Sequence, residues 1–276
     1  MSVNKTQIAV VSGSIILIVL LLFANTIPPP NKEEAKMSEH AGPNTIELAK
    51  LVQSGIAGLT SSQKQMIQKM EDATKSSADK KAAFEAIINE LDTLKIPVAA
   101  AFYMEKAAEA SPIEKNWTEA GNRYYAATRF AKEADRPILY SKAMDCFQKS
   151  LDLDPKNVEA KISLAACYVE GSSDPMKGIG MLREVEKTDS NNVNLQLNFA
   201  FFSEKSGQWD RAIARFQKVL KIQPDFIEAY LHLADAYQQK GDKAKAIESL
   251  EKYITLVDDV TIKTEVQDYI NKLKNS

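Results

Sequence analysis

The sequence predicts an all-helical protein built from repeated pairs of helices, and two observations lead to that prediction. Glycine is scarce, with 10 residues among 276, while alanine, lysine and glutamate are plentiful, a composition that favours helix over sheet. The stretch GQWDRAIARFQKVLKIQPD at 207–225 is followed 34 residues later by GDKAKAIESLEKYITLVDD at 241–259, with glycine, alanine and bulky apolar residues in matching places. A period of this length is typical of helical hairpins that stack on one another.

The N-terminal residues 1–25 are predicted to form a single transmembrane helix that anchors the chain. No charged residue lies between Thr6 and Asn31. As a helix, the apolar run 8–24 would span about 25 Å, close to the roughly 30 Å hydrocarbon core of a bilayer, so these residues are expected to contact lipid. A secretory signal peptide cleaved after Ala24 is the alternative. The length of the run, and the lack of a small residue three positions before that cut, favour the anchor.

Residues 26–44 are predicted to form a linker. Three consecutive prolines make the chain stiff and extended, and the charged stretch that follows has too little apolar content to fold by itself. The linker would hold the following residues away from a membrane surface.

Residues 45–112 are predicted to form a helical region of four pieces. Thr45 is placed to cap the first piece, and Thr60 with Gln63 resembles a capping box before the second. Pro97 suits the first turn of the fourth. The third piece carries an apolar stripe formed by Phe84, Ile87, Ile88, Leu91 and Leu94. Because the pieces do not align convincingly with one another, they are either diverged helical hairpins or a separate helical region.

Four two-helix units are predicted within a repeat region at 113–260. Aligning the chain on Pro155, Pro224 and their equivalents places the units at 114–157, 158–192, 193–226 and 227–260. The recurring residues are Trp117, Ala120, Gly121, Tyr124, Ala143, Phe147, Ser150 and Pro155; Leu164, Ala165, Tyr168, Gly178, Leu182 and Val185; Phe199, Ala200, Ala212, Phe216, Val219 and Pro224; and Tyr230, Leu233, Ala234, Tyr237, Gly241, Ala246 and Leu250. In this pattern the chain resembles the tetratricopeptide repeat (TPR) family over slightly more than half its length.

The resemblance implies an α-solenoid of about four repeats, in which small residues let helices approach and bulky ones fill the space between units. The first unit is about ten residues too long between its helices, so the extra residues either extend both helices or form a loop. The second unit has one extra residue, and Gly178 and Gly180 weaken its second helix. Residues 261–276 are predicted to form a capping helix, because Ile262, Val266, Ile270 and Leu273 share one side and charges occupy the rest.

No catalytic or metal-binding motif stands out, so the chain is not expected to be an enzyme or to hold a cofactor. Phosphate-loop, dinucleotide-binding and nucleophile-elbow patterns are absent, and the two histidines, His40 and His232, have no further ligand at useful spacing. The net charge of -2 gives no electrostatic basis for binding nucleic acid. Cys146 and Cys167 are interpreted as small buried side chains, with an oxidised pair as the alternative.

The resemblance also implies a concave groove, lined by the first helix of each unit, that binds a protein partner. The residues expected to face it are Asn122, Tyr125, Ile162, Ala166, Val169, Leu197, Asn198, Phe201, Leu231, His232 and Asp235. Since much of this set is apolar, the expected partner is an amphipathic helix or an extended apolar peptide. Some family members hold a C-terminal carboxylate with Lys, Asn and Arg. Only Asn122 matches that pattern here, so such a clamp is not expected. The alternative is that the chain's own helices from 45–112 cover the groove.

The chain is also similar to the N-terminally anchored TPR proteins of the bacterial inner membrane. Charges on the two sides of the anchor weakly favour a cytoplasmic N-terminus and a periplasmic C-terminal domain. This implies a scaffold for protein–protein contacts, in envelope complex assembly or as a chaperone-like partner of a translocon. A cytosol-facing membrane receptor for targeting peptides and a self-associating structural protein are the alternatives.

Overall fold

The computed structural model describes residues 43–275, so the predicted anchor, its lipid contact and nearly all of the predicted linker lie outside the described residues. The chain divides into two units, with the boundary between Lys50 and Leu51. Within the described part, thirteen α-helices and one short 3₁₀ turn make up all of the regular structure, which confirms the all-helical prediction. None of these described helices is both long and apolar enough to cross a bilayer.

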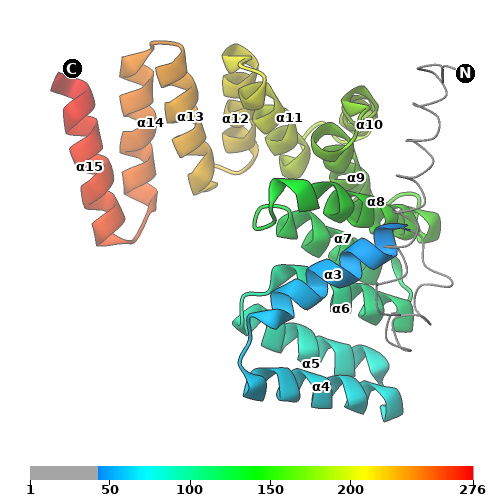
Figure 1. Cartoon of the computed structure of the whole chain (residues 1–276). Coiled ribbons are helices and arrows are strands. Elements are labelled where there is room, and N and C mark those ends of the chain that lie inside the picture. The colour runs from blue at the N-terminus through cyan, green and yellow to red at the C-terminus, as the bar shows by residue number, and fades with distance from the viewer. Residues whose placement is uncertain (1–42, 276) are drawn as a thin grey trace, which may run out of the picture. The chain divides into compact units, whose positions relative to one another are not determined.

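The helices follow one another along the chain, joined by short turns (Figure 1). Their bounds are α3 (Pro43–Ala57), α4 (Ser61–Ser76), α5 (Lys80–Thr93), α6 (Pro97–Ala110), α7 (Glu114–Ala127), α8 (Arg136–Leu153), α9 (Val158–Gly171), α10 (Pro175–Thr188), α11 (Val193–Lys205), α12 (Trp209–Ile222), α13 (Ile227–Gln239), α14 (Lys243–Leu256) and α15 (Val260–Asn275).

Local sequence signals explain where the N-terminal helices begin. Thr60 accepts a hydrogen bond from the Gln63 amide, and the Gln63 side chain accepts one from the Thr60 amide, which confirms the capping box at the start of α4. Pro97 opens α6 as predicted. The Thr45 prediction was wrong, because α3 begins at Pro43 and therefore already contains Thr45. A proline is well suited to the first turn of a helix, because the N–H group that it lacks would have no hydrogen-bond acceptor within the helix there.

The helices α5 and α6 form a hairpin that packs on α7. Lys80 and Glu114, the first residues of α5 and α7, are 34 residues apart, the same period as in the clearest repeats. Of the predicted stripe on α5, Ile87, Ile88 and Leu91 are buried, while its two end residues are half-buried. Of the two alternatives, a diverged helical hairpin describes α5 and α6. Their sequence differs from that of the clear repeats, but the 34-residue period is kept.

The extra residues of the first unit are accommodated by a longer connection and by one longer helix, not by the extension of both helices. The connection after α7 contains the short 3₁₀ turn Glu133–Asp135, and α8 is lengthened to 18 residues, whereas α7 keeps 14. In the second unit, α10 is a continuous helix despite its two glycines. Gly178 is needed for packing, because a Cβ there would lie 2.3 Å from the carbonyl oxygen of Ala165.

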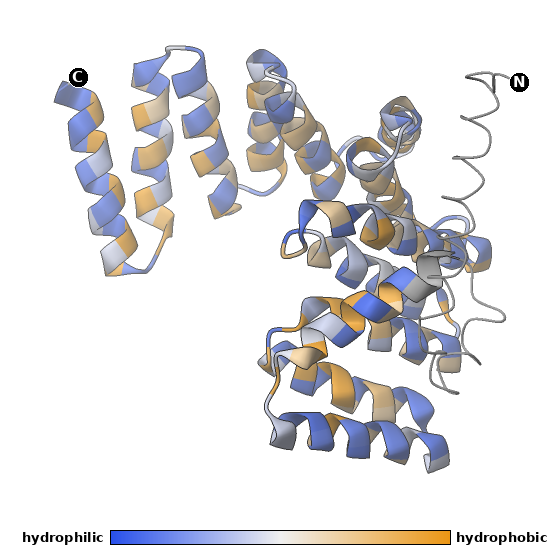
Figure 2. Cartoon of the chain, viewed as in Figure 1, coloured by the Kyte–Doolittle hydropathy of each residue, from blue (hydrophilic) through white to orange (hydrophobic). Residues whose placement is uncertain are grey.

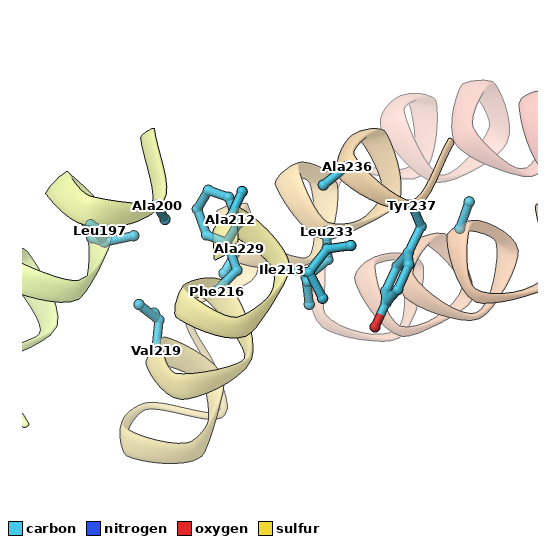
Figure 3. Packing of buried hydrophobic residues seen from close by; sticks show 11 residues of the cluster. Leu197, Ala200, Ala212, Ile213, Phe216, Val219, Ala229, Leu233, Ala236 and Tyr237 are labelled. Atoms are coloured by element: carbon cyan, nitrogen blue, oxygen red, sulfur yellow. The ribbon is translucent and has the colours of Figure 1, made fainter. Parts of the chain in front are cut away.

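Alternating small and bulky side chains build the core between successive helices. Figure 3 shows this for one cluster, whose labelled residues come from α11, α12 and α13. Phe216 is fully buried at its centre, and alanines at 200, 212 and 229 let the helices approach it. Gly207 and Gly241 have φ values of 68° and 77°, so they turn the chain between helices in a conformation that favours glycine.

A buried polar cluster fixes α6 to the next two helices. Glu105, only 4% exposed, accepts hydrogen bonds from the Tyr124 hydroxyl at 2.6 Å and from the Lys142 ammonium at 2.9 Å. Burial and the neighbouring Glu105 carboxylate raise the pKa of Tyr124 well above its ordinary value. Since each polar group has a partner, this cluster links α6, α7 and α8 in one arrangement.

The last helix, α15, packs one side on the preceding repeat. Ile270 is fully buried beside Ala234 and Leu250, and Val266 and Leu273 are partly buried next to it. Ile262 is 37% exposed and therefore buries less of its surface in this contact. Figure 2 shows hydrophilic and hydrophobic residues interleaved along α14 and α15, the pattern of helices with one apolar side.

Candidate functional site

The predicted groove residues lie on the first helices of successive pairs, α7, α9, α11 and α13, but they differ in accessibility. Ile162, Ala166 and Leu197 are 3%, 2% and 9% exposed, so they offer almost no surface to a partner, contrary to the expectation. Ile162 packs in the core with Leu182, and Leu197 packs in the cluster around Phe216. An apolar residue at such a position is drawn into the adjacent core because burial removes its surface from water.

The α7 and α9 part of this surface is polar. The Asn122 amide nitrogen donates to Glu159 Oε1 at 2.9 Å, and Ser163 Oγ lies 3.4 Å from Asn122 Oδ1. Asn122 also lines an open cleft of about 970 Å³ bounded by α5, α6, α7 and α9. Lysine, arginine, glutamate and asparagine side chains dominate its wall, so this part suits polar contacts rather than the expected apolar ones.

Tyr125 belongs to a hydrogen-bonded group with two residues that the sequence reasoning missed. Its hydroxyl donates to Glu170 Oε2 at 3.0 Å, and the Tyr140 hydroxyl donates to the same oxygen at 3.2 Å. Burial, followed by the nearby Glu170 carboxylate, raises the pKa of both tyrosines. Tyr140 lies near the start of α8, in the lengthened part of the first unit where the repeat pattern gives no register, so nothing in the sequence indicated its role.

An exposed aromatic cluster lies on α11 and α13, and we call it the α11–α13 surface (Phe201, Glu204, Leu231, His232 and Asp235). The Phe201 and His232 rings meet edge to face with centroids 4.9 Å apart. Phe201 is 39% exposed and Leu231 37%, so residues 51–112 do not cover them. Asp235 is exposed one turn from Leu231. Asn198 bonds instead to its own helix, at the carbonyl of Asn194.

Glu204 adds a carboxylate to this surface and was also missed. Its Oε2 lies 3.3 Å from His232 Nδ1, while its Oε1 is buried without a hydrogen-bond partner among the described residues. Glu204 lies three residues after Phe201, so helical spacing alone would have placed it on the same side. The α11–α13 surface therefore offers an apolar contact area beside acidic oxygens, with no activated nucleophile among its members.

The remaining predicted residue and the cysteines lie elsewhere. Val169 is half-buried and lines a different cleft, between the α9–α10 and α11–α12 pairs. Cys146 and Cys167 are both buried free thiols whose pKa is raised by burial, which confirms the first of the two interpretations. Among residues 43–275, no three His, Cys, Asp or Glu side chains are grouped closely enough to hold a metal ion.

Family models identify tetratricopeptide repeats in the C-terminal part of the chain. A TPR repeat model matches residues 205–241, and a tetratricopeptide repeat model matches residues 227–256. These ranges include α12, α13 and α14, the region where the 34-residue period is clearest.

Two solved structures with low sequence identity share the fold. A tetratricopeptide repeat protein from Parabacteroides merdae superposes with a TM-score of 0.54 over 83% of this chain and 88% of its own, at 14% identity. A thermophilic TPR protein from Thermus thermophilus gives 0.51 over 71% of this chain and 100% of its own, at 15% identity. The described helices therefore form a TPR-like α-solenoid.

Curated relatives match only part of the chain. Superkiller protein 3 of Schizosaccharomyces pombe is 27% identical over 118 residues, which cover 40% of this chain and 8% of that protein. The cytochrome c-type biogenesis protein CcmH of Escherichia coli is 29% identical over 86 residues, 30% of this chain and 25% of that protein. The chain thus spans a quarter or less of the length of these relatives.

Proposed function

Because the chain carries tetratricopeptide repeats, a fold that acts as a scaffold for protein–protein contacts, we propose that it is a membrane-anchored scaffold without enzymatic activity. The α11–α13 surface is its main binding surface, with the polar first-helix cleft at Asn122 as a second contact region. The observation that carries this proposal is the exposure of Phe201 and Leu231 beside the His232–Glu204 pair.

The chemistry of the surface defines the partner. Phe201 and Leu231 supply apolar area for one or two side chains of an amphipathic helix or extended peptide. The exposed Asp235 adds a carboxylate at the edge, and the largely buried Glu204 adds negative charge beside His232, so a positively charged group on the partner is favoured. The partner segment is therefore apolar with a basic flank.

The location proposed for this scaffold is the bacterial inner membrane, with the repeats in the periplasm and a role in assembling envelope complexes or in assisting a translocon. The uncharged apolar run 8–24 and the weak charge asymmetry around it support this location. Similarity to part of a cytochrome c-type biogenesis protein is consistent with an assembly role. A cytosol-facing receptor and a self-associating structural protein remain the two alternatives.

Affinity purification of the full chain from its own cells tests the proposal. The wild type is compared with a Phe201→Ala/Leu231→Ala variant and with a Phe130→Ala/Val260→Ala control, which removes two apolar side chains elsewhere that are even more exposed. Each truncation at a binding hot spot costs about 2 kcal/mol of binding free energy, so the first variant loses its partner. The proposal fails if both double variants retain the same proteins.

A further inference from the structure

The junction between the α9–α10 pair and the α11–α12 pair is packed differently from its neighbours. The helices α8 and α9 approach each other closely, as do α12 and α13, whereas α10 and α11 have few close backbone approaches. The size of the side chains explains the difference. Met181, Phe199 and Phe202 pack between the α9–α10 and α11–α12 pairs, whereas small alanine side chains occupy the α12–α13 junction. The wider spacing leaves room that side chains do not fill.

A cleft of about 670 Å³ occupies this junction, and we call it the inter-pair cleft. Its apolar wall includes Val169, Met176, Ile179, Phe199 and Phe202, with Met176 65% exposed. The volume lies within the range of about 300–1,000 Å³ that is usual for ligand pockets. On α11, Phe199 and Phe202 project to a different side of the helix from Phe201, because each residue advances about 100° around the axis. The cleft is therefore separate from the α11–α13 surface.

The inter-pair cleft is positively charged. Its charged residues are Arg183, Arg211 and Arg215 against the single carboxylate Glu186, a net charge of +2. Arg215 is already engaged, because its guanidinium donates to Glu186 and Gln196 and stacks 4.4 Å from the Phe199 ring centroid.

The two other arginines are available to a ligand. Arg211 is exposed and bonds the uncharged Gln208. Arg183 is exposed and forms no ion pair among residues 43–275. Two unneutralised guanidinium groups at the rim of an apolar cleft favour a ligand that combines apolar and acidic groups.

We propose that the inter-pair cleft binds an acidic peptide segment with a large apolar side chain. The apolar side chain enters between α10 and α11 against Phe202 and Met176, and carboxylates on either side of it pair with Arg183 and Arg211. This is a second site beyond the scaffold function proposed above, and its ligand has the opposite charge to the segment expected at the α11–α13 surface.

A fluorescent reporter at the rim of the cleft tests this proposal on the full chain. Ala214 is exposed and lines the cleft, so Ala214→Cys carries an environment-sensitive dye such as acrylodan. Both natural cysteines are buried with a raised pKa, so labelling is selective for the new thiol. The probe is a synthetic hexapeptide with two central leucines flanked on each side by two aspartates. Matched peptides replace the aspartates by lysine or the leucines by alanine.

The expected result is saturable binding of the acidic apolar probe, at least tenfold tighter than either matched peptide. Arg183→Glu on α10 with Arg211→Glu on α12 weakens this binding at least tenfold. Lys218→Glu with Lys221→Glu, two charge reversals on α12 outside the cleft lining, has much less effect. Phe201→Ala leaves the probe affinity unchanged, which separates this site from the α11–α13 surface.

Three results would overturn the proposal. One is equal affinity for the acidic and basic probes. Another is no effect of the Arg183 and Arg211 charge reversals. The third is a dye signal that changes with the chain's own concentration and not with peptide, which identifies a second copy as the occupant. If the Phe201→Ala/Leu231→Ala variant has lost its cellular partner but still binds the probe, the result supports the inter-pair cleft as a site separate from the α11–α13 surface.

Discussion

The imidazole of His232 lies flat against the ring of Phe216, with the two ring centroids 5.1 Å apart and the planes inclined by 9°. Phe216 is fully buried, whereas the His232 side chain is 39% exposed, so the histidine closes the core of one repeat pair and at the same time forms part of the α11–α13 surface. His232 therefore contributes both to folding stability and to the proposed binding surface. Variants at His232 and at its neighbours should separate the two contributions.

Substitution of His232 by alanine should lower stability, while substitution of its neighbour should not. His232→Ala removes the stack on Phe216 and the contact with Glu204, which should cost about 1 kcal/mol of unfolding free energy. Leu231→Ala trims an exposed side chain and should change stability by less than about 0.5 kcal/mol. Urea unfolding followed by circular dichroism measures both, and equal losses would contradict this division of roles.

Breaking the buried cluster at Glu105 should destabilise the junction between α6 and α8. Lys142→Met leaves the Glu105 carboxylate buried with only the Tyr124 hydroxyl as a partner, which should cost about 3 kcal/mol. Lys106→Met, which breaks the exposed pair with Glu109, should cost less than about 0.5 kcal/mol. If chemical denaturation shows similar losses for both, the buried cluster does not fix α6 as described.

Two glycine-to-alanine substitutions should have opposite effects. A Cβ at Gly121 would lie 2.6 Å from the ring of the fully buried Phe147, so Gly121→Ala should destabilise the protein by about 2 kcal/mol. A Cβ at Gly180 meets no described atom within 4 Å, and Gly180→Ala in helix α10 should stabilise it by about 0.5–1 kcal/mol. Thermal unfolding curves of the two variants compare them directly.

The Glu186–Arg215 pair should make stability depend on acid pH. Hydrogen bonding from Arg215 holds the pKa of Glu186 below its ordinary value of 4.5. Because the folded-state pKa lies below that of the unfolded chain, the contribution of Glu186 is complete above the unfolded value and is lost as the pH falls through the folded one. Glu186→Gln should therefore be destabilising at neutral pH, and its deficit should shrink at acid pH. A deficit that is constant with pH would contradict the pairing.

The period of the repeats and the residue types that recur in them were enough to predict the helical pairs, because such positions are dictated by close packing. Phe216 and Leu250, for example, are buried as the pattern requires. The same reasoning could not decide whether α5 and α6 form a repeat-like pair, since the residues at their contacts have changed although the 34-residue period has not. Burial there is satisfied by many combinations of apolar side chains.

The candidate site was less predictable than the fold. Of the residues chosen from family positions, Phe201 and Leu231 are exposed, but Ile162 and Leu197 at similar positions lie in the core. Which of these apolar residues is exposed depends on the spacing between neighbouring helices, and this is set by side chains on other units. The inter-pair cleft depends on the same spacing, which no single motif encodes.

Site-specific photo-crosslinking from position 201 tests the central claim most directly. A photoreactive phenylalanine analogue replaces Phe201 in the full chain expressed in its own cells, and Glu248, exposed on α14, carries the same analogue as a control. The account predicts a crosslink to a second protein from position 201 that is absent from position 248. Crosslinks from position 201 only to residues 45–112 of the same chain would contradict it.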